Sequence, residues 1–277
     1  MIPIFVVNLK KDIQKKKDMQ RISKKHNLEI EYIEAIYGEE LPQSEIDKVY
    51  SERRAIQKFG RGLSRGEIGC ALSHISIFKK MTENNIQRAI VLEDDVLLCN
   101  NFSKILLKLL DMQIEYDMVL FGYDADIKRD VFLYTSLWGN KKLLKEYKLK
   151  RLIKVGLGTY GYMITLHGAQ KLSQKIKFVD MPIDHYAGDV KNLNLYGLSP
   201  RCVTVSEYNL FNSSIVKERD ELKKFLVSSK YNNLFTRLLN RIRLGIRLII
   251  LKILPLTLSQ RYATVIFRNK RKDNITK

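Results

Sequence analysis

Cysteine is scarce in this sequence, and its few thiols form no recognisable framework. Only Cys70, Cys99 and Cys202 occur, and no two of them make a CxxC pair. An odd number of distant cysteines favours neither a disulfide framework nor a cysteine zinc site. A reducing compartment is therefore the expected environment.

Long apolar runs are also missing. No stretch approaches the roughly 18 uninterrupted apolar residues of a membrane-spanning helix. The apolar run in residues 1–8 has no basic segment before it and no small-residue cleavage site after it. We therefore expect a first strand there rather than a secretory signal, and a protein that lies on a bilayer without crossing it.

Acidic residues are too few to balance the basic ones. The formal net charge is +19 at pH 7, which favours anionic partners such as nucleotides, nucleic acid, acidic glycans or acidic lipid. The excess is concentrated at one end, because residues 230–277 hold twelve Lys and Arg and a single acid, Asp273.

This C-terminal segment has the pattern of a membrane-surface helix. Several apolar side chains share one helical arc that Arg237, Arg241, Arg247 and Lys252 avoid: Leu238, Leu239, Ile242, Ile246, Ile249, Ile250 and Ile253. Anionic lipid would supply the missing counter-charges, at about 1 kcal/mol per basic residue. A helix packed on the core with a solvated basic edge is the alternative. We predict one domain over 1–215 and a basic amphipathic tail over 216–277. The tail implies a cytoplasmic protein, peripheral on the inner face of the membrane.

Short apolar runs alternate with helical patterns in the first 215 residues. The runs cover 2–7, 89–92, 118–121 and 160–165. This alternation predicts an α/β fold. The clearest helix starts at Ser64, which can form a capping box with Glu67, and residues 10–28 predict a surface helix after the first strand.

An acidic triplet, Glu93-Asp94-Asp95, directly follows the apolar run 89–92. Open α/β sheets bind ligands at the carboxyl ends of their strands. In an extended segment Glu93 and Asp95 would share one face and Asp94 the other. Two converging carboxylates suit Mg²⁺ or Mn²⁺ bridging a diphosphate. The alternative is an acidic turn in which one Asp caps a following helix.

A second cluster lies in residues 181–189, where Asp184, His185 and Asp189 stand in an apolar, turn-prone setting. A carboxylate within hydrogen-bond reach of a sugar hydroxyl can act as a general base. The alternative is a helix N-terminus capped by Asp184, with His185 and Asp189 exposed.

Three further features give weaker signals. His74, beside Ser73 in the capped helix, is on its own typical of a hydrogen-bonded histidine at the core edge. The glycines of 156–161 predict a tight turn before a strand. The aromatic and basic side chains of 128–151 suit a sugar-stacking lid or a plain surface loop.

Taken together, these motifs resemble glycosyltransferase family 25, the bacterial lipooligosaccharide galactosyl- and glucosyltransferases. Five ordered blocks carry the resemblance: 4–9, 63–74, 89–96, 158–162 and 182–184. It implies a GT-A-type, Rossmann-like catalytic domain, a UDP-sugar donor, a Mn²⁺ or Mg²⁺ ion, and inversion at the anomeric carbon. It further implies hexosyl transfer in lipopolysaccharide biosynthesis, β-galactosyl transfer being favoured over glucosyl, onto a lipid-linked oligosaccharide.

The resemblance also implies roles for individual residues. Asp95 and Glu93 would bind the metal, and Glu93 would also meet the donor ribose. Asp184, or failing that Asp189, would be the base that deprotonates the acceptor. The remaining donor-binding residues would be Asn8, Arg65, Ser73, His74 and Asp94.

Two other classes of protein fit part of the pattern. A basic membrane- or nucleic-acid-binding protein without catalysis would bind in a salt-sensitive way and turn over no sugar nucleotide. A metal-dependent phosphoesterase would hydrolyse its substrate without a glycan acceptor. The five ordered blocks favour the transferase, for which nucleic acid is not an expected partner.

Overall fold

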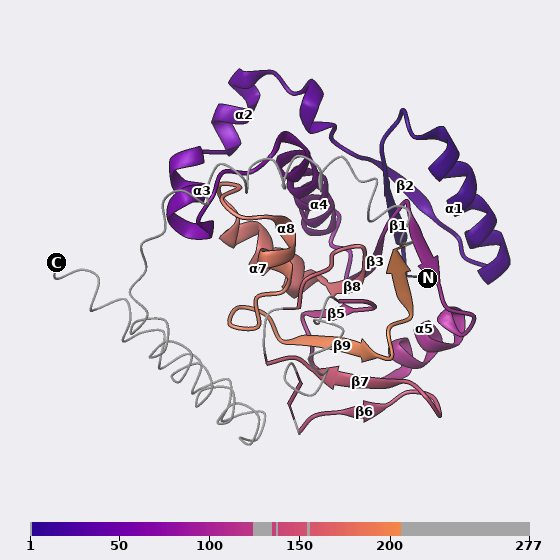
Figure 1. Cartoon of the computed structure of the whole chain (residues 1–277). Coiled ribbons are helices and arrows are strands. Elements are labelled where there is room, and N and C mark those ends of the chain that lie inside the picture. The colour runs from indigo at the N-terminus through magenta and orange to yellow at the C-terminus, as the bar shows by residue number, and fades with distance from the viewer. Residues whose placement is uncertain (1, 124–134, 137, 154–155, 206–277) are drawn as a thin grey trace, which may run out of the picture.

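The computed structural model describes residues 2–123, 135–136, 138–153 and 156–205 (Figure 1). The elements in chain order are β1 (Ile4–Asn8), α1 (Ile13–His26), β2 (Glu31–Glu34), η1 (Gly38–Glu40), α2 (Gln43–Val49), α3 (Glu52–Phe59), α4 (Arg65–Glu83), β3 (Arg88–Glu93), β4 (Val96–Leu98), α5 (Phe102–Asp111), β5 (Met118–Leu120), β6 (Lys141–Lys142), β7 (Lys148–Arg151), β8 (Gly161–Thr165), α7 (Leu166–Lys175), α8 (Ile183–Ala187), β9 (Leu195–Ser199) and β10 (Val203–Val205).

An eight-stranded sheet forms the centre of the fold, in the order β2-β1-β3-β8-β5-β9-β7-β6. Strand β1 pairs in parallel with β2 and β3, and β5 pairs in parallel with β9. Strand β8 runs antiparallel between β3 and β5. The carboxyl ends of β1, β2, β3, β5 and β9 therefore point to one edge, and the predicted α/β class is confirmed.

Both faces of the sheet are apolar and covered by helices. In β1, Phe5 and Val7 belong to the core on the side of α4, α7 and α8, whereas Ile4 and Val6 belong to the core on the side of α1 and α5. Alternation of side chains along a strand sends neighbours to opposite faces. Residues 4–7 of β1 are apolar without a break, so this strand must be buried on both sides.

The elements expected from the sequence are largely present. The apolar runs became β1, β3, β5 and β8, and the surface helix became α1. The capping box of α4 is confirmed: Ser64 Oγ accepts from Glu67 N at 3.1 Å, and Glu67 Oε2 accepts from Ser64 N at 3.0 Å. Arg61, which the sequence pattern did not single out, adds two hydrogen bonds to the Glu67 carboxylate, at 2.6 and 2.7 Å.

Glycine allows α4 to lie directly on the backbone that follows β2. A Cβ at Gly69 would lie 2.5 Å from the carbonyl oxygen of Ile36, and a Cβ at Gly38 would lie 1.7 Å from that of Arg65. No side chain fits at either position. The Ser73 hydroxyl reinforces this contact by accepting from Ile36 N at 2.8 Å.

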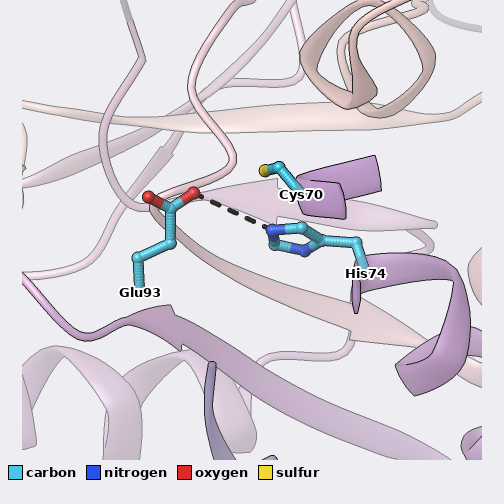
Figure 2. Close-up of side chains that lie close together, drawn as sticks. All are labelled: Cys70, His74 and Glu93. Carbon is cyan, nitrogen blue, oxygen red and sulfur yellow. Dashed lines mark ion pairs between the residues drawn. The ribbon is translucent and has the colours of Figure 1, made fainter. Parts of the chain in front are cut away.

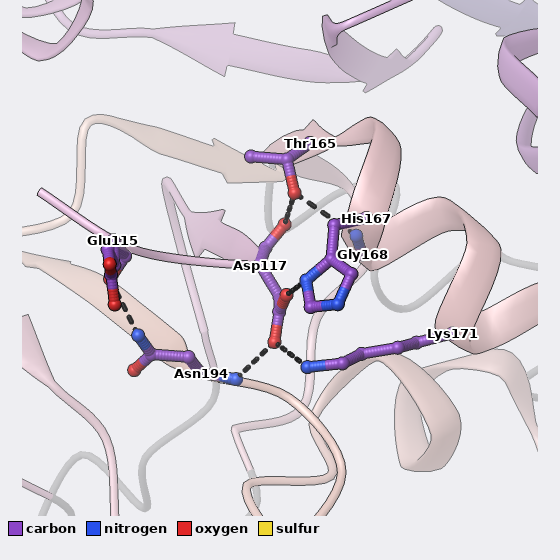
Figure 3. A network of polar contacts seen from close by, with 7 residues as sticks. All are labelled: Glu115, Asp117, Thr165, His167, Gly168, Lys171 and Asn194. Atoms are coloured by element: carbon purple, nitrogen blue, oxygen red, sulfur yellow. Dashed lines mark hydrogen bonds and ion pairs between the residues drawn. The ribbon is translucent and has the colours of Figure 1, made fainter. Parts of the chain in front are cut away.

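At the opposite, amino edge of the sheet, Asp117 ties three segments together (Figure 3). Its buried carboxylate lies 2.8 Å from His167 Nδ1 and 2.8 Å from Lys171 Nζ, both on α7, and accepts from Asn194 N at 2.7 Å. Its carbonyl oxygen accepts from Thr165 N at 3.0 Å. This network anchors α7 and the start of β9 to β5.

The predicted tail over 216–277 lies outside the described residues. In the segment 128–151, the interpretation as a lid or loop is wrong for the last part, because β6 and β7 form antiparallel edge strands there. Within the part of the chain that the structure describes, no helix combines the length and hydrophobicity of a membrane span.

Candidate functional site

The acidic triplet lies at the carboxyl edge of the sheet, where β3 ends. Asp94 and Asp95 form a turn before β4 and both face Lys15 of α1, at 3.2 and 3.5 Å from its Nζ atom. Glu93 instead faces His74 of α4, at 3.8 Å. The expected alternation, with Asp94 opposite Asp95, is wrong because extended backbone stops at Glu93. Neither aspartate caps a helix, since β4 follows the turn.

Asp94 is held on both carboxylate oxygens. Its Oδ2 accepts from Asn8 Nδ2 at 2.7 Å, and its Oδ1 lies 3.2 Å from Lys15 Nζ. Burial raises the pKa of Asp94, and Lys15 and Asn8 oppose that shift. The predicted donor-binding residues Asn8 and Asp94 are thus brought together, and their contact joins the ends of the neighbouring strands β1 and β3.

The two carboxylate oxygens of Asp95 have different surroundings. Its Oδ2 lies near Lys15, but its Oδ1 is buried without a hydrogen-bond partner among the described residues. A buried carboxylate oxygen without a donor is unfavourable unless a cation or ligand satisfies it. Oxygen ligands of this kind suit Mg²⁺ and Mn²⁺, so the residues present fit the predicted divalent ion.

Two residues of α4, Cys70 and His74, lie next to Glu93 (Figure 2). The His74 ring is fully buried, and its Nδ1 lies 2.8 Å from the hydroxyl of Tyr162. One ligand-type atom from each of Cys70, His74 and Glu93 lies within 4.8 Å of the other two. Burial raises the pKa of Glu93, which His74 opposes, and burial raises the pKa of the Cys70 thiol well above its usual value.

The two candidate bases lie in different surroundings. Asp184, in the first turn of α8, accepts from Thr159 Oγ1 at 2.6 Å and from Thr159 N at 3.2 Å, and its charge helps to raise the pKa of Glu93. The N-cap of α8 is Pro182, so the interpretation of Asp184 as the cap is wrong. Asp189 pairs instead with Lys175 of α7 and accepts from Lys191 N.

A cavity of about 660 Å³ lies beyond the carboxyl ends of β1 and β2. It is lined by residues 9–11, which follow β1, and by residues 34–37, 40 and 41. Arg65 is not a lining residue of this cavity, but its Nη1 donates to the carbonyl oxygen of the lining residue Leu41 at 2.7 Å. Ser73, also predicted to bind the donor, is buried, and its hydroxyl bonds to the backbone at Gly69 and Ile36.

Sequence reasoning missed Lys15, Cys70 and Tyr162 as members of this site. Lys15 was one of several lysines in a charged helix, and no local signal set it apart. Cys70 and Tyr162 lie inside the two blocks that also hold His74 and Thr159.

The site thus consists of carboxylates that follow β3 at the carboxyl edge of an α/β sheet, and the cavity lies at the same edge, beyond β1 and β2. This arrangement defines the class of α/β proteins that bind ligands outside their strand ends. The model of glycosyltransferase family 25 (LPS biosynthesis protein) matches residues 1–187. The chain therefore belongs to glycosyltransferase family 25.

Curated relatives agree with this assignment. Human procollagen galactosyltransferase 2 is 29% identical over 192 residues, which cover 66% of this chain and 29% of that protein. Procollagen galactosyltransferase 1-B of Xenopus laevis is 29% identical over 195 residues, covering 66% and 30%. A Drosophila melanogaster glycosyltransferase 25 family member is 27% identical over 183 residues, covering 61% and 27%. The chain spans less than a third of the length of these relatives.

Among solved structures, a glycosyltransferase involved in the glycosylation of the major capsid of PBCV-1 shares 13% identity at a TM-score of 0.31. The matched region covers 62% of this chain and 65% of that one.

Proposed function

We propose that this protein transfers a galactosyl group from UDP-galactose to a sugar hydroxyl of a lipooligosaccharide or lipopolysaccharide acceptor, with inversion at the anomeric carbon. The observation that carries the proposal is the buried, unpartnered Oδ1 of Asp95 in an acidic turn at the carboxyl edge of the sheet. Membership of a glycosyltransferase family turns this general ligand site into a proposed donor site.

The uridine of the donor would occupy the cavity beyond β1 and β2. Lys11 Nζ lies 3.3 Å from the centre of the Tyr37 ring at the wall of this cavity. The Tyr37 ring could stack on the uracil base, and the Lys11 ammonium could pair with the negatively charged diphosphate. Asn8, at the end of β1, links this cavity to Asp94 and the acidic turn.

Asp95 and Glu93 would hold a Mn²⁺ or Mg²⁺ ion, which when bound would stabilise the negative charge on the departing diphosphate. Lys15 keeps Asp94 paired and separate from this role, because both oxygens of Asp94 already have partners. These contacts therefore favour Asp95, and not Asp94, as the metal ligand.

Asp184 would take the proton of the attacking acceptor hydroxyl. Thr159 fixes its Oδ1 through two hydrogen bonds, so its Oδ2 is the oxygen left to face an acceptor. In an inverting displacement the base and the leaving group lie on opposite sides of the anomeric carbon. Asp184 lies on α8 and the acidic turn follows β3, so the base and the metal-bound leaving group could approach the anomeric carbon from different sides.

The choice of galactose and of acceptor rests on the comparisons. The human and Xenopus laevis relatives are procollagen galactosyltransferases, and the family description refers to LPS biosynthesis. A lipid-linked acceptor agrees with the basic amphipathic pattern of residues 216–277, which we propose binds the anionic inner face of the cytoplasmic membrane.

A donor and acceptor screen tests the proposed function. The full chain would be incubated with individual UDP-sugars, with and without Mn²⁺, and with truncated lipooligosaccharide or a procollagen peptide as acceptor. UDP release from UDP-galactose that requires lipooligosaccharide is the expected result. Phosphoester hydrolysis that needs no acceptor would instead identify a phosphoesterase, and salt-sensitive binding to anionic vesicles without turnover would identify a binding protein.

A further inference from the structure

Cys70, His74 and Glu93 form a compact group of three different ligand types (Figure 2). Cys70 and His74 are one turn apart on α4, and Glu93 ends β3 on the sheet beneath that helix. One sulfur, one nitrogen and one oxygen atom lie within 4.8 Å of one another, and His74 Nε2 lies 3.8 Å from Glu93 Oε1.

The histidine supplies an independent sign of a ligand. Its side chain is completely buried, and its Nε2 has no hydrogen-bond partner among the described residues. Its Nδ1 is engaged by the Tyr162 hydroxyl at 2.8 Å. Histidine ligands of metals are oriented in this way, with one ring nitrogen fixed by a neighbour and the other facing the ion.

The types of ligand atom in this group favour one metal ion over others. Thiolate and imidazole favour Zn²⁺ over Mg²⁺ or Mn²⁺, which prefer oxygen. Zinc–ligand bonds of 2.0–2.3 Å place the ligands of a tetrahedral ion about 3.3–3.8 Å apart. The three ligand atoms lie within 4.8 Å of one another, so zinc would have to draw them together by roughly 1 Å.

We propose that Cys70, His74 and Glu93 form a Zn²⁺ site with three protein ligands and a fourth position open to water. On binding, a zinc–sulfur bond replaces the S–H bond of Cys70, and the thiol proton passes to solvent. If the proposed function holds, zinc at this site removes Glu93 from the donor site and inhibits transfer.

Metal titration of the full chain, without any sugar nucleotide, tests the site directly. Zn²⁺ affinity would be measured by competition with a chromophoric chelator, and Co²⁺ would serve as a spectroscopic substitute. We expect one Zn²⁺ per chain and a thiolate-to-cobalt charge-transfer band. Cys70→Ser should abolish the band and weaken Zn²⁺ at least about 100-fold. Tyr162→Phe should keep the band and weaken Zn²⁺ about 10–100-fold, as loss of an outer partner does.

The other two thiols provide the matched control. Cys99 follows β4 and Cys202 precedes β10, and the two form a separate pair, with Cys99 N donating to the Cys202 carbonyl oxygen at 2.8 Å. A chain carrying both Cys99→Ser and Cys202→Ser keeps Cys70 as its only thiol, so its cobalt band must come from Cys70. This variant tests the site even if Cys70→Ser fails to fold.

Three outcomes would overturn the zinc site: no Zn²⁺ binding by the wild-type chain, equal affinity in wild type and a folded Cys70→Ser variant, or loss of the cobalt band in the double variant. None of these measurements involves donor or acceptor. Failure of the zinc site would therefore leave the proposed transfer untouched, and failure of transfer would leave the zinc site untouched.

Discussion

The Nζ atom of Lys15 lies 3.2 Å from Oδ1 of Asp94, so helix α1 places a positive charge on the acidic turn that follows β3. Burial alone would lower the pKa of Lys15, but Asp94, Asp95 and Asp12 outweigh burial and raise it. Lys15 therefore remains charged and compensates the repulsion between neighbouring carboxylates.

Replacing Lys15 by methionine should separate charge compensation from metal binding. Two unit charges about 4 Å apart interact by about 1 kcal/mol in water, and Lys15 is 41% exposed. The variant should therefore bind Mn²⁺ about fivefold more tightly, while galactosyl transfer falls because Asp94 loses a partner. Mn²⁺ affinity is measured by calorimetry. Lys17→Met, on the exposed face of the same helix, is the control; equal affinities in both variants would contradict the role of Lys15.

Asp95→Asn should abolish transfer and leave the fold intact. The Oδ1 atom of Asp95 has no partner among the described residues, so its replacement costs little folding free energy. Loss of a group that stabilises charge in the transition state typically lowers kcat about 10²–10³-fold. Turnover and thermal unfolding are measured together. Near-normal turnover in the folded variant would rule out Asp95 as the metal ligand.

Asp184→Asn and Asp189→Asn form a matched pair that identifies the base. Removal of a general base costs about 10²–10⁴-fold in rate. The charge of Asp184 helps to raise the pKa of Glu93, whereas Asp189 pairs with Lys175. We expect Asp184→Asn to lose transfer far more than Asp189→Asn while still binding UDP, as measured by calorimetry. The reverse order of activity would assign the base to Asp189.

The sequence predicted those parts of the fold and site that depend on local pattern. Apolar runs of strand length predicted β1, β3, β5 and β8, and the Ser64–Glu67 pair predicted the start of α4. The acidic turn was predicted at a strand end because ligands bind at the carboxyl edge of such sheets. Each of these signals lies within a few consecutive residues.

The parts that were missed depend on contacts between distant residues. Lys15 and Asp94 are separated by 79 positions, and His74 and Tyr162 by 88. No local pattern distinguishes Lys15 from the other lysines of α1. The orientation of Asp94 also depended on where β3 ends, which is the least predictable property of a strand.

Gly69→Ala should destabilise the protein although it lies inside a helix. Alanine in place of glycine normally stabilises a helix interior by about 1 kcal/mol. At Gly69 the new Cβ would lie 2.5 Å from the Ile36 carbonyl oxygen and 2.6 Å from Gly38 N, and neither backbone atom can move freely. Overpacking of this kind costs about 1–3 kcal/mol. Urea unfolding measures the change, and a stabilised variant would show that α4 can shift away from residues 36–38.

Cys99 should be the most reactive thiol among the three at neutral pH. A hydrogen bond from the Cys202 thiol is the main cause that lowers the pKa of Cys99 to about 6, whereas burial raises the pKa of Cys70 and of Cys202 well above the usual value. A thiol with a lowered pKa is already mostly thiolate, the nucleophilic form, above that pKa. Iodoacetamide should therefore label Cys99 first. The labelling rate should rise through about pH 6 and level off by about pH 7, whereas an ordinary thiol, with a pKa of about 8.5, would level off only at higher pH. Site-resolved mass spectrometry follows the reaction, and Cys202→Ala, which removes the donor, should move the half-maximal rate of Cys99 to higher pH. A half-maximum that stays near pH 6 in that variant would show that Cys202 does not stabilise the Cys99 thiolate.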